Sequence, residues 1–104
     1  MGILRIVRME FELESIEQFD KMFHEVKHHI EAMPGCQQVL LLTSPKRPAI
    51  RTTLSWWSHE DDLNAYRSSK FFGEIWPKTK ANFKGDPIAW SVQWNVADGM
   101  TFDV

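Results

Sequence analysis

The order of its predicted elements places this chain in the α+β class, as a ferredoxin-like βαββ(αα)β fold with an antiparallel sheet. Three observations lead to this prediction. Residues 3–13 and 88–96 alternate in side-chain character with period two, which is typical of strands. Residues 16–33 carry one apolar stripe at helical spacing. Residues 36–43 and 49–57 form two further strand-like runs, and a short proline-containing loop makes them an antiparallel hairpin.

The first strand carries a charged side chain on an otherwise apolar face. Period two places Arg5 on the same face as a set of apolar residues, namely Ile3, Val7, Met9, Phe11 and Leu13. A buried guanidinium is costly unless it is paired. We therefore expect Arg5 to form a structural ion pair, and the alternative is that it binds an enolate or a phenolate.

The long helix has boundary signals at both ends. Ser15, with Gln18 three residues later, is a capping-box pattern, and Pro34 with Gly35 ends the helix. Its apolar stripe repeats at intervals of three and four residues: Ile16, Phe19, Phe23, Val26, Ile30 and Met33. The next strand is apolar on both faces at residues 39–42, which predicts that both of its faces are covered.

The third strand ends in two tryptophans, and two short helices follow it. Trp56 and Trp57 point to opposite faces of the sheet, so one should face the helices and a ligand cleft and the other a dimer interface. Ser58 is predicted to cap the first short helix, and the pair Ser68-Ser69 is predicted to interrupt that helix and cap the second. Pro77 is predicted to kink or restart the second helix.

The 104 residues are predicted to form a single domain, with a core of about residues 3–96 and a C-terminal extension over residues 97–104. Helices can cover only one face of the predicted sheet, whereas the second and fourth strands offer apolar residues to both faces. A second copy of the chain is the simplest cover for the other face. We therefore expect a homodimer.

Charge and composition exclude several classes of function. The formal net charge is −2, whereas nucleic-acid binding needs a basic stripe. The single cysteine, Cys36, excludes a disulfide framework and a multi-cysteine zinc site. No apolar run approaches the roughly 20 residues that span a bilayer, and the N-terminal segment is too polar for a secretory signal. We expect a cytoplasmic protein that binds neither nucleic acid nor membrane.

Several motifs together suggest a family. They are Pro34-Gly35-Cys36, Trp57-Ser58-x-Glu60-Asp61, Leu63-x-x-Tyr66-Arg67-x-Ser69, Phe72, Ile75-Trp76 and Pro87-x-Ala89-x-Ser91. Through them the chain resembles the antibiotic biosynthesis monooxygenase (ABM) family over residues 3–96. The resemblance implies a dimeric α+β barrel, in which two sheets pack face to face and each subunit holds a ligand cleft between its helices and its sheet. Members of the family include cofactor-independent oxygenases, quinol oxygenases, haem-degrading enzymes and proteins with no demonstrated activity.

The sequence argues against the haem-degrading branch of that family. Aligned on Phe72, the iron-ligating histidine of those enzymes falls at Trp76, whose indole nitrogen is only a donor. Residues 3–13 also contain no counterpart of the asparagine that those enzymes carry on the first strand. No axial ligand for a haem iron therefore stands where one is needed.

The aromatic residues supply most of the candidates for a binding site. Five tryptophans and seven phenylalanines are many for 104 residues, and each ring has a large area to bury. The candidates for substrate binding are Trp56, Trp57, Tyr66, Phe72, Trp76, Phe23 and Arg5. A plain core role is favoured for Phe23 and Phe72, whereas for Tyr66 and Trp76 a core role and a ligand contact are equally open. No catalytic residue is assigned.

The histidines and the cysteine suggest no cofactor. His24 and His28 have a chelating spacing on the long helix, but they lie opposite its apolar stripe and are interpreted as an exposed pair. Cys36 is interpreted as a buried structural thiol, since no neighbouring base is evident. There is no glycine-rich phosphate loop and no metalloprotease motif. We predict neither a metal nor an organic cofactor.

Three functions stay open. The first is cofactor-independent oxygenation of a small electron-rich aromatic molecule (a phenol, quinol or anthrone), although no general base is evident. The second is a non-catalytic dimer that binds a small apolar metabolite or serves in a stress response. The third is a largely structural dimer whose cleft is filled by its own side chains. Turnover separates the first two, and a filled cleft beside Tyr66 and Trp76 would indicate the third.

Overall fold

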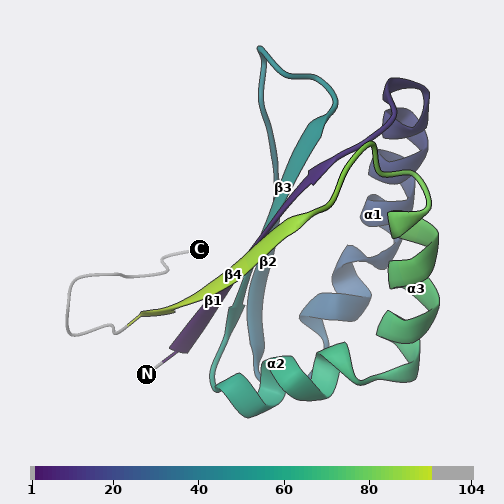
Figure 1. The fold of residues 1–104 in the computed structure, drawn as a ribbon. Helices are drawn as coiled ribbons and strands as arrows, with labels where there is room; N and C mark the ends of the chain where they lie inside the picture. The colour runs from purple at the N-terminus through teal and green to yellow at the C-terminus, as the bar shows by residue number, and fades with distance from the viewer. Residues whose placement is uncertain (1, 95–104) are drawn as a thin grey trace.

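The computed structural model describes residues 2–94, and it has the predicted α+β fold. In that part of the chain, four antiparallel strands form one sheet in the order β2-β3-β1-β4, with three helices on one of its faces (Figure 1). The strands are β1 (Gly2–Glu10), β2 (Cys36–Thr43), β3 (Ile50–Trp57) and β4 (Ile88–Trp94). The helices are α1 (Ile16–Glu31), α2 (Glu60–Arg67) and α3 (Lys70–Lys80), with a short 3-10 turn, η1 (Leu13–Ser15), before α1.

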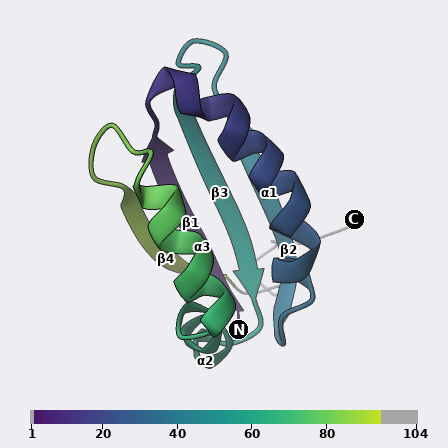
Figure 2. The same cartoon turned by 90° about the vertical axis from the view of Figure 1, so that its right-hand side faces the viewer.

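The helix-facing side of the sheet carries the main core. Strand β1 is central and pairs with β3 on one side and β4 on the other, and Arg5 stands opposite Ser55 and Ser91. Figure 2 shows α1 and α3 lying side by side over this face, with α2 at one end. Phe11 and Trp57 are fully buried beneath them. The rest of this core comes from β1, β2 and the apolar faces of α1 and α2: Ile3, Met9, Phe19, Phe23, Ile30, Val39 and Leu63.

The other face of the sheet is apolar and has no helix over it (Figure 1). A small cluster of Leu4, Trp56 and Trp94 lies there, packed against Ile6, Leu40 and Leu54. Four large apolar side chains on the edge strands remain exposed: Leu42 (43%), Ile88 (53%), Trp90 (43%) and Val92 (41%). In a single chain these apolar side chains stay in contact with water, which is unfavourable.

The tryptophan pair at the end of β3 divides between the two faces as period two requires. Trp57 belongs to the core under the helices, and Trp56 belongs to the cluster on the uncovered face.

Several local predictions were wrong. β1 ends at Glu10, and beyond it Phe11 forms only an isolated bridge to Phe83, so Leu13 leaves the strand face and is 62% exposed. The predicted caps at Ser15 and Ser58 do not form. The Ser15 hydroxyl bonds Asn82 Oδ1 (3.3 Å), while the Ser58 hydroxyl accepts from Gln37 Nε2 (3.1 Å) and α2 begins after His59.

The start of α3 agrees with the sequence, and one of the two predicted effects of Pro77 is excluded. Of the predicted Ser68-Ser69 pair, it is Ser69 that caps the helix, since its Oγ accepts a hydrogen bond from the Phe72 amide (3.1 Å). The helix does not restart at Pro77 but continues through it to Lys80. The predicted strand residues 95 and 96 and the extension over 97–104 lie outside the described residues. None of the helices within residues 2–94 has the length and apolar character that crossing a bilayer requires.

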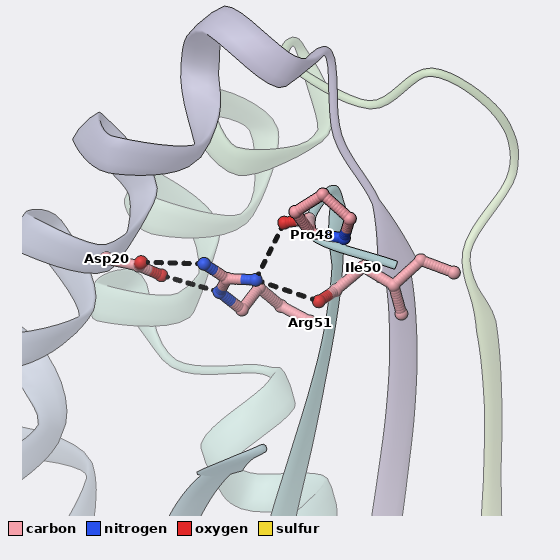
Figure 3. A network of polar contacts seen from close by, with 4 residues as sticks. All are labelled: Asp20, Pro48, Ile50 and Arg51. Carbon is pink, nitrogen blue, oxygen red and sulfur yellow. Dashed lines mark hydrogen bonds and ion pairs between the residues drawn. The ribbon is translucent and has the colours of Figure 1, made fainter. Parts of the chain in front are cut away.

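An ion pair fastens α1 to the sheet (Figure 3). Arg51 on β3 is buried, and its Nε and Nη2 each donate to a carboxylate oxygen of Asp20, both at 2.9 Å. Its Nη1 donates to the backbone carbonyls of Pro48 (2.9 Å) and Ile50 (3.0 Å). Hydrogen bonding to Asp20 raises the pKa of Arg51. It is the one ion pair within residues 2–94, and no local pattern of residues predicted it.

Candidate functional site

A cavity of about 260 Å³ lies between the helix-facing side of the sheet and the three helices. Its lining is mostly apolar, with aromatic rings from α1, α2 and α3. The residues around it are Arg5, Val7, Met9, Phe19, Met22, Phe23, Val26, Ile30, Val39, Thr53, Ser55, Leu63, Tyr66, Arg67, Phe72, Ile75, Trp76, Thr79 and Ala89. Apolar walls with a few polar groups are usual for a small-molecule site.

A continuous chain of aromatic contacts forms the side of the cavity made by the short helices. Tyr66 stacks on Trp57 with ring centroids 5.1 Å apart and meets Phe72 edge-on at 5.1 Å. Phe72 in turn stacks on Trp76 at 5.7 Å, and Trp76 meets Phe83 edge-on at 5.7 Å. Phe72 and Trp76 are four residues apart on α3 and therefore share one face of it. The cap at Ser69 determines the residue at which α3 begins.

The floor of the cavity is polar where β1 and β3 cross it. Arg5, Thr53 and Ser55 face the helices, and all three line the cavity. Trp57 lies under Tyr66, and its Nε1 donates to the Ser55 hydroxyl at 2.9 Å. The tryptophan thus fixes the position of Ser55 without itself lining the cavity.

Arg5 has no carboxylate partner within residues 2–94, so the predicted ion pair is wrong. Its Nη1 donates to Ser91 Oγ at 3.2 Å, on the neighbouring strand. Burial, and then the charge of Arg67, lower the pKa of Arg5. Arg5 and Arg51 both lie on the helix-facing side of the sheet, and the carboxylate of Asp20 pairs with Arg51 and not with Arg5. Arg5 is therefore a cation with unused donors at the edge of an apolar cavity.

Two ionisable groups near the cavity stay protonated at neutral pH. Burial raises the pKa of Tyr66 to about 12, and the nearby Cys36 adds to the shift. Burial likewise raises the pKa of the Cys36 thiol to about 11, although Cys36 is half-buried and not the fully buried thiol that the sequence predicted. Neither group is a base at neutral pH. Tyr66 can donate a hydrogen bond to a ligand, because its hydroxyl has no partner among the described residues.

A family model for antibiotic biosynthesis monooxygenases matches residues 2–76, which is more than half of the chain. The chain belongs to the ABM family. The match includes β1, α1, the β2–β3 hairpin, α2 and α3 as far as Trp76, and so all the residues that line the cavity except Thr79 and Ala89.

Solved structures share the ABM fold at low sequence identity. A conserved protein from Methanosarcina mazei Go1 is 18% identical with a TM-score of 0.85, over 91% of this chain and 94% of the other. An antibiotic biosynthesis monooxygenase is 16% identical with a TM-score of 0.82, over 89% and 98%. A variant of SnoaB, a cofactor-independent oxygenase from Streptomyces nogalater, is 12% identical with a TM-score of 0.81, over 99% and 98%. No curated protein matches the chain in sequence.

The structure brings together most of the candidate residues of this ABM domain. Five of the seven line the cavity: Arg5, Phe23, Tyr66, Phe72 and Trp76. Trp57 packs behind Tyr66, and Trp56 lies on the opposite face of the sheet. His24, His28 and His59 are exposed. In the described part of the chain, no three His, Cys, Asp or Glu side chains are grouped to hold a metal ion.

Four polar residues of the cavity were not proposed from the sequence: Thr53, Ser55, Arg67 and Thr79. Thr53 and Ser55 share the helix-facing side of β3 with Trp57, and the same period of two that divided Trp56 from Trp57 would have found them. Arg67 was quoted in a motif only for its resemblance. Its place next to Tyr66 at the end of α2 was the signal that it reaches the same cavity.

Proposed function

We propose that this ABM protein is a cofactor-independent monooxygenase that acts, as a homodimer, on a small electron-rich aromatic molecule of the phenol, quinol or anthrone type. The observation that carries the proposal is the cavity itself, which is lined by stacked aromatic rings on one side and by Arg5, Thr53 and Ser55 on the other. Membership of the ABM family and the fold shared with SnoaB support the reaction class. A likeness of fold alone would not, because one fold serves many functions.

The chemistry requires that the substrate supply the electrons. For an anthrone, one atom of O₂ replaces the two hydrogens of the reactive CH₂ as a new C=O, and the other atom leaves with those hydrogens as water. The protein would hold the ring against Trp76 and Phe72, direct a hydrogen bond from Tyr66 to a ligand oxygen and keep water out. Orientation and exclusion of water are effects that an apolar cavity can supply without a bound group.

The homodimer accounts for the uncovered face of the sheet. Trp90, Val92, Ile88 and Leu42 expose large apolar areas there, beside the Leu4, Trp56 and Trp94 cluster. Two such faces packed together would form the α+β barrel that the family resemblance implies. Light scattering should therefore give about twice the 12.2 kDa mass of one chain at micromolar concentration. A cytoplasmic location is a prediction from the sequence alone.

Non-catalytic binding is the second candidate, and a specific observation favours it. The two raised pKa values leave no base at neutral pH among the cavity residues, since Tyr66 and the nearby Cys36 both hold their protons. A ligand could then bind without turnover. The third function, a filled cleft, has less support because the cavity beside Tyr66 and Trp76 is open.

Oxygen uptake tests the proposal directly. The purified protein, treated with chelator, is offered a panel of hydroquinones, anthrones and flavonols. Enzyme-dependent uptake should fall by tenfold or more in Trp76→Ala and more weakly in Tyr66→Phe, which removes only the hydroxyl. Phe71→Leu is the matched control, because Phe71 lies on the same helix but stacks on His29 and does not line the cavity. No uptake across the panel, with binding retained, would favour the non-catalytic dimer.

A further inference from the structure

Two guanidinium groups line the cavity from different sides. Arg5 stands on β1, in the floor, and Arg67 is the last residue of α2, at the helix side. The charge of Arg67 lies close enough to Arg5 to lower its pKa. Two positive charges at one cavity repel each other, and an anion bound between them would be attracted to both and offset this repulsion.

The described residues give these arginines few polar partners, although Arg67 is exposed to solvent and Arg5 is half-buried. Of the five N–H donors of Arg5, one bonds to Ser91, and the Arg67 side chain has no hydrogen bond or ion pair with residues 2–94. Within residues 2–94, no Asp or Glu lines the cavity. Arg51 shows the contrast, because it faces the same helices and is satisfied by Asp20 and two carbonyls.

We propose that the cavity binds its aromatic ligand as an oxyanion, a phenolate or an enolate, with the charged oxygen between Arg5 and Arg67 and the ring against Phe72 and Trp76. The ligand is thus flat and apolar at one end and negatively charged at the other. Charge-assisted hydrogen bonds to two guanidinium groups suit a single oxygen anion, and the free donors of Arg5 are available for it.

This inference rests on the proposed function for the nature of the ligand, and it supplies what the reaction otherwise lacks. Burial raises the pKa of Tyr66 to about 12, so Tyr66 keeps its proton at neutral pH, and no His, Asp, Glu or Lys within residues 2–94 lines the cavity. With two cations beside it, the ligand hydroxyl loses its proton to water, and the electron pair stays on the oxygen. The arginine pair lowers the ligand pKa and so replaces a general base.

The test measures the ionisation of a bound phenol. We use para-nitrophenol, because its phenolate absorbs visible light and its phenol does not, and because an electron-poor ring is a ligand rather than an oxygenation substrate. Spectra are recorded over a pH series with protein in excess. The bound ligand should titrate at least about one pH unit below the free ligand, which means that the phenolate binds about tenfold more tightly than the phenol.

Variants assign the effect to the two arginines. Arg5→Gln and Arg67→Gln should each reduce the preference for the phenolate several-fold. Arg47→Gln removes the same charge from the exposed β2–β3 loop and should leave the preference unchanged. Binding of para-nitrotoluene, the neutral analogue, is followed by quenching of tryptophan fluorescence. It should persist in both cavity variants and so show that the cavity is intact.

The possible results are distinct. A bound ligand that titrates with the free ligand, an absence of phenolate binding, or a shift that survives in both arginine variants would each overturn the inference. Oxygen uptake does not enter into any of these readouts. A phenolate preference without oxygenation would uphold the inference while the monooxygenase proposal fails, and oxygenation without a phenolate preference would do the reverse.

Discussion

Replacing Asp20 with alanine should lower the free energy of unfolding by about 2 kcal/mol, because it leaves the Arg51 guanidinium buried without its carboxylate. Removing one partner of a fully buried pair costs about 3–5 kcal/mol, and an exposed pair contributes about 0–1 kcal/mol. This pair lies between those limits, since the Arg51 side chain is 9% exposed and that of Asp20 is 33% exposed. Arg51 would also keep the carbonyls of Pro48 and Ile50.

Urea denaturation, followed by tryptophan fluorescence at one fixed protein concentration, measures this loss. The concentration must be held because the stability of the proposed dimer would depend on it. Glu25→Gln, an exposed acid on the same helix, is the control. The double variant Asp20→Leu with Arg51→Met should lose less than the sum of the single losses, because it leaves no charge unpaired. If Asp20→Ala stays within about 0.5 kcal/mol of the control, the pair does not fasten α1 to the sheet.

Three further outcomes follow from single positions. Gly35→Ala should cost about 2 kcal/mol or more in urea denaturation, because Gly35 has a φ of 80° and an added Cβ would meet the Asp62 side chain; an unchanged midpoint would contradict this. Tyr66 is the single tyrosine, and its pKa is raised from 10.0 to about 12, so the stability that its burial contributes is present below pH 10 and lost as the pH rises toward 12. Absorbance titration should follow that ionisation, and Tyr66→Phe should remove this part of the loss. Trp90→Glu should give a 12.2 kDa monomer by light scattering, and a persisting dimer would exclude the uncovered face as its interface.

Local patterns were sufficient to predict the sheet and helices. The period of two in the strands and the spacing of three and four in α1 each reflect the geometry of a single element, so they can be read along the chain. The capping signals at Ser15 and Ser58 failed because a hydroxyl near a helix start has other partners. For Ser15 that partner is Asn82, which is 67 residues away.

The site was predictable only in part, because its polar residues depend on how α1 packs. Arg5 and Arg51 both face the helices, and nothing local tells which of them meets an acid. The answer comes from the path of α1, which lies on the β2 and β3 side of the sheet and brings Asp20 to Arg51 (Figures 2 and 3). Arg5, nearer the α3 side, is left for Ser91 and the cavity.

The alternation along β1 also limits how this protein can change in evolution. Arg5 faces the cavity, while its neighbours Leu4 and Ile6 pack on the uncovered face. Inserting or deleting one residue early in the strand would exchange the two sets, since a shift of one position turns every following side chain to the other face. A cation would then lie on the apolar surface and leucine in the floor of the cavity. We therefore expect β1 to tolerate substitutions but not insertions or deletions, and we expect changes of length to occur in connections such as residues 44–49.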